Sequence, residues 1–353
     1  MQRITSNGSR KPGSKPTRLF GLAAAVAAIA VPAIGASPAS AGNHSVNGVR
    51  ADVRHGTLMV QGGDGGQRVA LRLQAGDSSR IQVDAGDNGS ADFSFARADV
   101  DAIRVRMGDG NDSARIDDAN GAFTDSIPTT IAGGDGNDSL EGGQVQVAAE
   151  NERFIGGDGN DIVDGGKGND TAYLGDGNDT FRWDNGEGSD VIEGQGGTDT
   201  MVFNGAPVAE QVTMSANAGR LKFFRVQGNV TMDTNGVEIV DDNPVGGADS
   251  VTVNDLTGTD VTQTNLDLAG SFGGSTADGA VDNVVVNGTN GDDNVSISGN
   301  GSGADVTGLT TAVSVKHADP TDTLSVNTLP GTDHVATSSV AGLIKVLVNG
   351  VLV

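Results

Sequence analysis

A run of nine-residue repeats in the middle of the chain constrains its fold more than any other feature of the sequence. From residue 156 the chain reads GGDGNDIVD, GGKGNDTAY and LGDGNDTFR, and after two further residues it continues NGEGSDVIE and GQGGTDTMV. Two related units precede these, MGDGNDSAR at 107–115 and GGDGNDSLE at 133–141. They follow the pattern G-G-x-G-x-D-x-U-x, in which U is apolar. Repetition at a short, regular period predicts a solenoid, in which each coil packs only against its neighbours.

The residue types within each unit predict its local structure. Glycine at the first, second and fourth positions permits a tight turn with positive φ angles. The three residues after the aspartate suit a short strand whose apolar member points inward. Each unit is then half a coil, and units 18 residues apart stack. The aspartates expected to pair by this stacking are Asp161 with Asp179, Asp170 with Asp190, and Asp179 with Asp199. The two inserted residues, Trp183 and Asp184, are expected to bulge outward.

The aspartate at the sixth position of each unit is the candidate metal ligand. Calcium prefers six to eight hard oxygen ligands, many of them backbone carbonyls, and these turns offer carboxylates and carbonyls together. Without a cation, carboxylates stacked about 5 Å apart would repel one another by several kcal/mol. The sequence therefore predicts several Ca²⁺ ions along the two edges of the solenoid. The aspartates concerned are Asp112, Asp138, Asp161, Asp170, Asp179, Asp190 and Asp199.

These units resemble the RTX, or haemolysin-type, calcium-binding repeat family. The resemblance covers residues 156–202 most closely, with isolated units between 107 and 141. It implies a parallel β-roll with calcium in the turns on both edges, held by the sixth-position aspartates and by backbone carbonyls. The carbonyls that it implies lie around Gly156, Asp158, Gly165, Lys167, Gly175, Asp176 and Gly177. Leu174, Asn185 and Gln195 depart from the glycine pattern of the family.

A second repeat occupies the C-terminal half of the chain. Residues 249–260, 282–293 and 322–333 share the pattern D-x-[VL]-x-V-N-x-[LT]-x-G-x-D. The alternating β-branched residues predict a strand, and the glycine that follows predicts a turn. The segment GTNGDDNVSI at 288–297 is also close to a calcium nonapeptide, with threonine in place of the second glycine, and makes Asp293 a further candidate ligand.

Together these patterns predict an all-β fold, a parallel β-roll or β-helix solenoid of calcium-binding nonapeptides flanked by further short-strand β repeats. The alternative is three small β modules joined near residues 94–106 and 204–246. A thin aliphatic core also explains why 55 Gly accompany only 10 Phe, one Tyr and one Trp. The expected segments are a signal peptide at 1–41, an N-terminal β region at 42–106, RTX repeats at 107–203, a connecting β region at 204–246 and a C-terminal β-repeat region at 247–353.

The first 41 residues have the three parts of a secretory signal peptide. A basic stretch precedes an apolar run at 19–36, and Ala39-Ser40-Ala41 forms a cleavage site. The alternative is a membrane anchor, which Pro32 and Gly35 disfavour in a weakly apolar run that is rich in alanine. We therefore expect a secreted, extracellular protein without membrane insertion after cleavage, and the periplasm or the cell surface are alternative destinations.

Composition narrows the classes of function. The net charge of −24 repels nucleic acids and anionic membranes. The absence of cysteine excludes disulfides and thiolate metal sites. The motifs H-E-x-x-H, G-x-S-x-G and G-x-x-x-x-G-K-[ST] are also absent from the sequence, and nearly all carboxylates lie in glycine-containing turns. We therefore do not expect an enzyme.

The sequence thus predicts a secreted protein in which calcium binds the G-G-x-G-x-D turns and drives folding of a β-roll. One alternative is a calcium-dependent cell-surface adhesin or matrix protein, whose partner the sequence does not identify. A remote alternative is a secreted hydrolase with RTX repeats, which residues 42–155 disfavour because they are too repetitive for a catalytic domain.

Overall fold

The structure is a computed structural model that describes residues 44–145 and 151–353. The predicted signal peptide lies outside the described residues. The described chain consists of strands and three short 3₁₀ helices, η1 (Arg97–Asp99), η2 (Asp118–Asn120) and η3 (Gln227–Asn229). None of the described segments forms a helix of the length and apolarity that a membrane span requires. The predicted all-β class is therefore confirmed.

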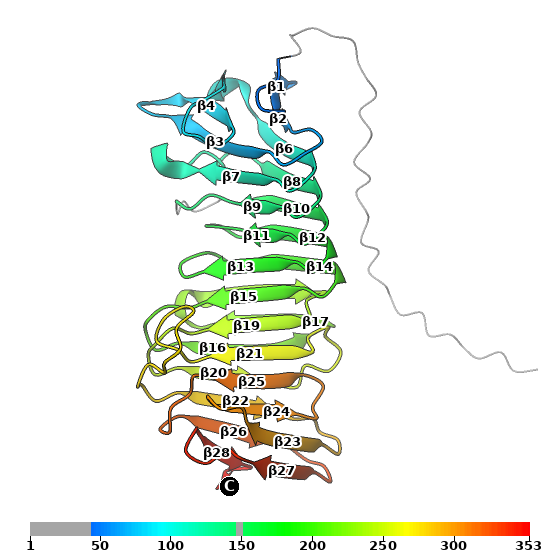
Figure 1. The fold of residues 1–353 in the computed structure, drawn as a ribbon, viewed down its shortest axis with the longest axis vertical. Coiled ribbons are helices and arrows are strands. Elements are labelled where there is room, and N and C mark those ends of the chain that lie inside the picture. The colour runs from blue at the N-terminus through cyan, green and yellow to red at the C-terminus, as the bar shows by residue number, and fades with distance from the viewer. Residues whose placement is uncertain (1–43, 146–150) are drawn as a thin grey trace, which may run out of the picture. The chain divides into compact units, whose positions relative to one another are not determined.

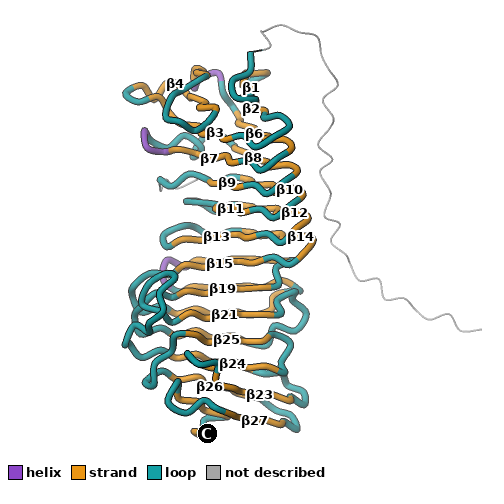
Figure 2. Tube along the Cα trace, viewed as in Figure 1, coloured by secondary structure: helices purple, strands orange, loops and turns teal. Residues whose placement is uncertain are grey.

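The strands form two sheets that stack coil upon coil (Figures 1 and 2). We call the 15-stranded sheet the first sheet and the 14-stranded sheet the second sheet. In spatial order, the first sheet contains β1 (Arg50–Arg54), β2 (Thr57–Gln61), β6 (Ala102–Asp109), β8 (Thr129–Asp135), β10 (Arg153–Asp158), β12 (Thr171–Gly177), β14 (Val191–Gly197), β18 (Val230–Asn235), β17 (Arg220–Arg225), β16 (Gln211–Asn217), β20 (Ser250–Val253), β22 (Asn283–Asn287), β26 (Thr323–Asn327), β28 (Lys345–Val348) and β29 (Val351–Leu352).

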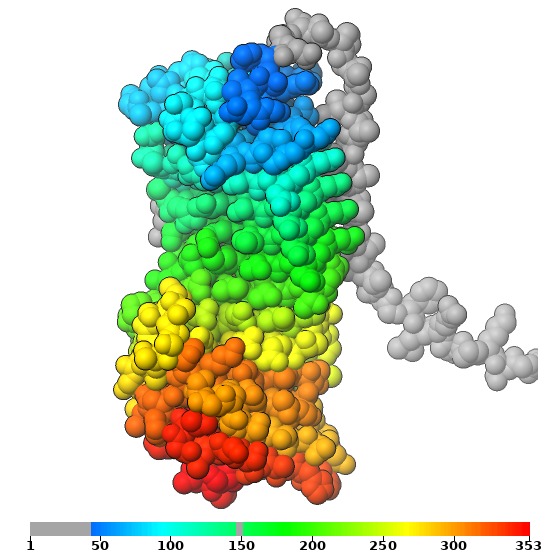
Figure 3. All heavy atoms as spheres, viewed as in Figure 1, coloured from blue at the N-terminus to red at the C-terminus, as the bar shows by residue number. Residues whose placement is uncertain are grey.

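The second sheet supplies the other half of each coil. In spatial order, it contains β27 (His334–Ser338), β23 (Asn294–Gly299), β24 (Ala304–Thr307), β25 (Ala312–Lys316), β21 (Gln263–Asp267), β19 (Ile239–Asn243), β15 (Thr200–Asn204), β13 (Thr180–Asp184), β11 (Ile162–Asp164), β9 (Ser139–Glu141), β7 (Ser113–Asp117), β3 (Arg68–Gln74), β4 (Asp77–Ala85) and β5 (Phe93–Ala96). In the space-filling view the colours follow one another in bands along the stack, as expected when each coil packs against its neighbours (Figure 3).

Strands of successive coils pair in parallel, and the register follows the repeat. Between β10 and β12, Gly157 lies opposite Gly175 and Asp158 lies opposite Asp176. Residues 18 positions apart therefore stack, as the nonapeptide period predicts. Within the strands, buried and partly exposed residues alternate, because successive side chains of a strand point to opposite faces. The parallel β-roll predicted for the repeats is thus confirmed.

The two inserted residues do not bulge outward, so this prediction was wrong. Trp183 and Asp184 extend strand β13, where Trp183 pairs in register with Phe203 of β15. The Trp183 side chain is fully buried, and its ring stacks on that of Phe203 at a centroid distance of 4.0 Å. The next coil also carries a large buried apolar residue, Phe203, at the same register position.

Antiparallel segments interrupt the parallel stack at β16–β17–β18 and at β23–β24–β25. Further antiparallel strands lie at the ends of the sheets, in β1–β2, β3–β4–β5 and β28–β29. The segments 94–106 and 204–246, proposed above as connections between separate modules, contribute strands to the same two sheets. A single apolar core also runs between the sheets, from Val49 to Val346. Three separate β modules are therefore not observed.

Candidate metal centre

The turns between the two sheets form two edges, and the sixth-position residues stack along each of them. We call the turns that lead from the first sheet to the second the first edge, and the turns that lead back the second edge. Along the first edge the stacked residues are Gln67, Asp112, Asp138, Asp161, Asp179, Asp199 and Glu238. Along the second edge they are Glu152, Asp170 and Asp190, followed by Glu210, Asp249, Asp282 and Asp322.

One carboxylate oxygen of each predicted aspartate belongs to a ladder of hydrogen bonds. The backbone N–H of Asp138 donates to Oδ1 of Asp161 at 2.8 Å, and that of Asp161 donates to Oδ1 of Asp179 at 2.8 Å. The N–H of Asp179 donates to Asp199 in the same way, at 2.9 Å. On the second edge the N–H of Asp170 donates to Oδ1 of Asp190 at 2.8 Å. The three aspartate pairs predicted from the period are therefore neighbours in the structure.

The second carboxylate oxygen of these aspartates is buried and has no hydrogen-bond partner among the described residues. The atoms concerned are Oδ2 of Asp112, Asp138, Asp161, Asp170, Asp179, Asp190 and Asp199. Buried polar atoms in folded proteins are nearly always hydrogen-bonded, and leaving one unpaired costs about 1–3 kcal/mol. A row of buried, unpaired carboxylate oxygens fits a hard divalent cation such as Ca²⁺.

Burial also opposes ionisation of these carboxyl groups. The pKa of Asp161 is raised to about 7, mainly by burial and in smaller part by the charges of Asp138 and Asp179. The pKa of Asp138 and that of Asp199 rise to about 6, and that of Asp190 to about 7, with burial as the main cause in each case. A cation in the turns would stabilise the ionised carboxylates and reverse these shifts.

The glycines of the repeat are required by the close approach of successive turns. A Cβ atom on Gly156 would lie 2.3 Å from Oδ2 of Asp161, so the first glycine makes room for the aspartate carboxylate. Gly175 has a φ of +121°, and a Cβ atom there would lie 1.9 Å from the carbonyl oxygen of Gly157 in the preceding coil. Leu174 replaces the first glycine of its unit, and its side chain lies in the apolar core instead.

The residues implied as carbonyl ligands lie in the turns, where several of their backbone groups join successive coils. The carbonyl oxygens of Asp158 and Asp176 accept N–H bonds of 2.6 and 2.7 Å from glycines of the preceding coil, and both side chains are exposed. The N–H of Lys167 donates to the carbonyl of Gly143 at 2.7 Å. A Cβ atom on Gly165 would lie 2.9 Å from Oδ2 of Asp170, and one on Gly177 would lie 1.8 Å from the carbonyl oxygen of Gly159. Their role as calcium ligands stays a prediction.

Asp293 differs from the other candidate ligands. Its Oδ2 accepts the backbone N–H of Thr289 at 3.0 Å, and its Oδ1 accepts the hydroxyl of the same residue at 2.9 Å. Thr289 occupies the position of the second glycine. Its hydroxyl, which glycine lacks, supplies the bond to Oδ1, whereas the bond to Oδ2 comes from the backbone N–H. The carboxylate of Asp293 therefore does not share the unpaired oxygen that marks the other sites.

The structure also adds residues to the ladder that the sequence argument did not place there. The unit GGDGGQRVA at 62–70 has glutamine where the repeats have aspartate, and its Gln67 N–H donates to Asp112. Glu152, Glu210 and Glu238 occupy sixth positions without the flanking glycine pattern. In the C-terminal half, the sixth-position residues are Asp249, Asp282 and Asp322, which are the first aspartates of the second repeat motif. The second repeat motif was therefore the sequence signal by which these three aspartates could have been placed in the ladder.

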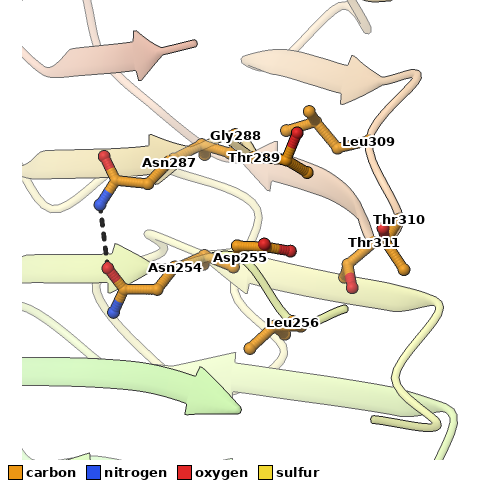
Figure 4. A pocket seen from close by; sticks show the side chains of 11 residues that line it. Asn254, Asp255, Leu256, Asn287, Gly288, Thr289, Leu309, Thr310 and Thr311 are labelled. Carbon is orange, nitrogen blue, oxygen red and sulfur yellow. Dashed lines mark hydrogen bonds between the residues drawn. The ribbon is translucent and has the colours of Figure 1, made fainter. Parts of the chain in front are cut away.

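The asparagine that the three copies of the second repeat motif share also joins successive coils. The side-chain amide of Asn287 donates to Oδ1 of Asn254 at 2.9 Å (Figure 4). The side-chain amide of Asn327 donates to Oδ1 of Asn287 at 2.9 Å. The pocket beside them, lined by residues that include Leu256 and Thr311, has a volume of about 10 Å³. That volume suits at most one water molecule. The asparagines therefore join coils, and the pocket is too small for an organic ligand.

A second acidic cluster lies on the second edge, next to the inserted residues. One carboxylate oxygen each of Asp164, Asp184 and Glu187 lies within 4.8 Å of the others. Burial raises the pKa of Glu187 to about 9, with the charge of Asp164 as the next cause. Arg182 forms an ion pair with Asp164 and so neutralises part of the cluster.

The coils, their glycine turns and the unpaired carboxylates define a β-roll with acidic edges whose buried oxygens could hold metal ions. The family model of the RTX calcium-binding nonapeptide repeat matches residues 129–144, 148–181 and 186–205, in four copies. Residues 129–205 therefore carry RTX calcium-binding repeats, and these repeats support a calcium-binding repeat protein. The unit at 107–115 lies outside the matched residues, although its Asp112 joins the same ladder. No curated protein and no solved structure matches the chain.

Proposed function

We propose that this protein is exported through its N-terminal signal peptide, and that calcium outside the cell completes the fold of its β-roll. The observation that carries this proposal is the row of buried Oδ2 atoms without partners along the two edges. Bound calcium would supply the positive charge that these carboxylates lack. The aspartates and the turn carbonyls would hold the ion, and the protein would have no catalytic activity of its own.

Calcium then acts as a folding ligand. A ligand that binds only the folded state stabilises it by about 2.7 kcal/mol per site at a hundredfold excess over Kd. Calcium sites of extracellular modules typically have Kd values of about 10⁻⁴ to 10⁻³ M. Such sites are empty at cytosolic calcium concentrations and filled outside the cell. Export would therefore convert an expanded, self-repelling chain into a folded one.

The test is a calcium titration by calorimetry, with far-UV circular dichroism on the same samples. We expect several ions to bind and the β signal to increase over the range in which they bind. Magnesium is the control, because its smaller radius and octahedral preference suit carboxylate-and-carbonyl turns poorly. Identical spectra in chelator and in calcium of the order of 10 mM, about ten times the weaker Kd, would refute calcium-coupled folding.

A second candidate function is attachment to a cell surface or matrix in a calcium-dependent manner. The exposed third-position aspartates favour it, because they stack in register on the first edge, about 4.8 Å apart. The residues in this column are Asp64, Asp109, Asp135, Asp158 and Asp176. The test is retention on cell walls with and without chelator, for the protein and for its D109N/D135N/D158N variant. A freely diffusing protein would show no retention in either condition.

A further inference from the structure

A pocket at the N-terminal end of the first sheet is lined by basic and amide side chains and by no carboxylate. The residues that line it are Gly48, Arg50, Gln61, Gly62, Gly63, Arg106 and Gly108. Its volume is about 350 Å³, and sites for small organic molecules typically have about 300–1,000 Å³. Strands β1, β2 and β6, which supply the three long side chains, are neighbours in the first sheet (Figure 1). The pocket therefore lies outside the matched calcium repeats, which begin at residue 129.

Three side-chain donors stand in one row across this pocket. Arg50 of β1 pairs in register with Gln61 of β2, and Gln61 pairs with Arg106 of β6. All three belong to the outer face of the sheet, since Val60 and Val105, next to Gln61 and Arg106, are buried in the core. A strand spacing of about 4.8 Å places the Cα atoms of the two arginines about 10 Å apart. Both guanidinium groups can therefore reach one ligand between them.

The fold does not use these three side chains. The described arginines that form ion pairs are Arg54, Arg72, Arg97, Arg115, Arg182, Arg220 and Arg225. Arg50 and Arg106 form none with another described residue, and neither they nor Gln61 makes a side-chain hydrogen bond within that part of the chain. A guanidinium group binds a carboxylate or a sulfate through two parallel hydrogen bonds. The free donors of the pocket therefore suit an anionic ligand.

The charge of this end of the molecule differs from that of the rest. Residues 44–106 hold eight arginines and eight aspartates, with no lysine or glutamate, whereas the whole chain carries −24. Asp52 on the same face pairs with Arg54, and Asp64 and Asp109 in the adjoining turns do not line the pocket. At physiological salt, exposed charges further away than about 8 Å are largely screened. The pocket can therefore attract a small anion in spite of the net charge.

Glycines form the rest of the lining because the turns approach one another closely. A Cβ atom on Gly62 would lie 2.0 Å from the carbonyl oxygen of Met107. One on Gly108, whose φ is +106°, would lie 2.6 Å from the carbonyl oxygen of Gly63. The lining thus contains no apolar side chain, which disfavours lipids and aromatic acids. Its volume exceeds that of a simple inorganic anion and suits a small anion rich in hydroxyl groups.

We infer that this pocket binds an acidic saccharide, with a carboxylate or sulfate group of the sugar held between Arg50 and Arg106. The amide of Gln61 both donates and accepts hydrogen bonds, as the hydroxyl groups of a sugar do. The inference gives a ligand class to the surface attachment proposed above. The site itself needs neither the third-position aspartates nor the nonapeptide turns.

The test is a titration of the protein in saturating calcium, followed by NMR because weak binding is measurable in this way. The probes are a uronate disaccharide, a monosulfated disaccharide, a neutral disaccharide and inorganic sulfate. Both acidic disaccharides should bind at least about tenfold more tightly than the other two probes, because only they combine the anionic group with sugar hydroxyls. Arg50→Gln and Arg106→Gln should each weaken their binding by about tenfold or more.

The matched control is Arg54→Gln. It removes the same charge from the same face of β1, but Arg54 lies outside the pocket and pairs with Asp52. Its affinity for both acidic disaccharides should change by less than about twofold. Equal losses in R54Q and R50Q would indicate attraction by the general charge of this face and would overturn the proposed site.

Gly63→Leu tests the pocket by its shape. A Cβ atom on Gly63 would have only the carbonyl oxygen of Gly48 within 4 Å, at 3.7 Å, and the φ of Gly63 is not positive, so the variant should fold. Its side chain should fill the pocket and abolish binding while both arginines remain. Unchanged binding in G63L, or in R50Q and R106Q, overturns the proposal, as does the absence of binding by either acidic disaccharide.

Two further results separate this proposal from those made above. Inorganic sulfate that binds as tightly as the sulfated disaccharide would reduce the site to a simple anion site and overturn the assignment of a saccharide. Asp161→Asn, in saturating calcium, should bind both acidic disaccharides as the unsubstituted protein does. If the protein binds them but is not retained on cell walls, surface attachment is refuted and the saccharide site stands.

Discussion

In Asp161, Oδ1 accepts a hydrogen bond from the backbone N–H of Asp138, whereas Oδ2 is buried without a partner among the described residues. The two oxygens of one side chain therefore have different roles. The first joins successive coils and does so without metal. The second is available to a cation, and without one it makes the folded state less stable. An asparagine would keep an oxygen that accepts the hydrogen bond. It could not bind a cation at the second position, since its amide nitrogen is a donor.

We therefore predict that Asp161→Asn loses the stabilisation by calcium at its site but keeps the calcium-independent stability of the fold. In a hundredfold excess of calcium over Kd, the variant should lose about 3 kcal/mol of unfolding free energy, the contribution of one site. In chelator it should be as stable as the unsubstituted protein or more stable, because a buried charge is removed. Urea unfolding in the two conditions measures both values.

Asp158→Asn is the control for this experiment. Asp158 lies three residues earlier in the same turn, but its side chain is exposed. Its substitution should change the unfolding free energy by less than about 0.5 kcal/mol in either condition. Equal losses for D161N with and without calcium would show that the carboxylate serves the fold alone.

At the scale of elements, the ladder continues into coils that lack the glycine pattern. Asp249, Asp282 and Asp322 repeat the N–H to Oδ1 bond. The position five residues before each aspartate, glycine in most repeats, is held by Pro244, Ala277 and His317. These coils keep the hydrogen bond that joins turns, but no oxygen of Asp249, Asp282 or Asp322 is among the buried atoms without a hydrogen-bond partner in the described residues. Their aspartates serve chiefly to align the coils of the C-terminal half.

This interpretation predicts opposite results for two substitutions of Asp282. Asp282→Ala removes the acceptor for the buried N–H of Asp249 and should cost about 1–3 kcal/mol of unfolding free energy. Asp282→Asn retains an acceptor oxygen and should be close to neutral, which makes it the matched control. Urea unfolding in saturating calcium measures both. A large loss in D282N would indicate that the negative charge, and with it a cation, is needed there.

The same elements show how far sequence reasoning reaches. The nonapeptide period predicted the parallel pairing of β10 with β12, because glycine turns and apolar alternation are local signals. It did not predict that Trp183 would enter the core, because that depends on the length of the next coil. The burial of Asp242 inside strand β19 was also not predicted, because a charged residue is expected on the outer face of a strand. The glutamates at sixth positions were missed because glutamate replaces aspartate and each of their units keeps at most one of the three glycines.

At the scale of the whole molecule, folding brings together acidic side chains that lie far apart in the sequence. The protein carries 46 Asp and Glu against 22 Lys and Arg, and the two edges concentrate many of these acids in buried turns. Folding without calcium therefore requires several carboxyl groups to take up protons. Calcium and protons compete for the same oxygens. The stability of the protein should depend on pH in opposite directions with and without the metal.

The sign of the calcium-free dependence follows from the pKa values. Asp138 and Asp199 have folded-state pKa values of about 6 and Asp161 of about 7, all above the ordinary value of 3.8. Between pH 3.8 and its folded-state pKa, each of these groups binds more protons in the folded state than in the unfolded state. Its stabilising contribution is complete below pH 3.8 and is lost as the pH rises through 6 to 7. In chelator, the thermal midpoint should therefore fall between about pH 5 and pH 7.5.

In saturating calcium the midpoint should rise over the same interval, because deprotonation of these carboxyl groups is what permits the metal to bind. Thermal unfolding followed by circular dichroism, at matched ionic strength, gives both profiles. D161N is the internal control, since removing one titrating carboxyl group should reduce both slopes. Profiles that run parallel with and without calcium would mean that the buried aspartates do not exchange protons for metal, and that the edges of the roll are stabilised in another way.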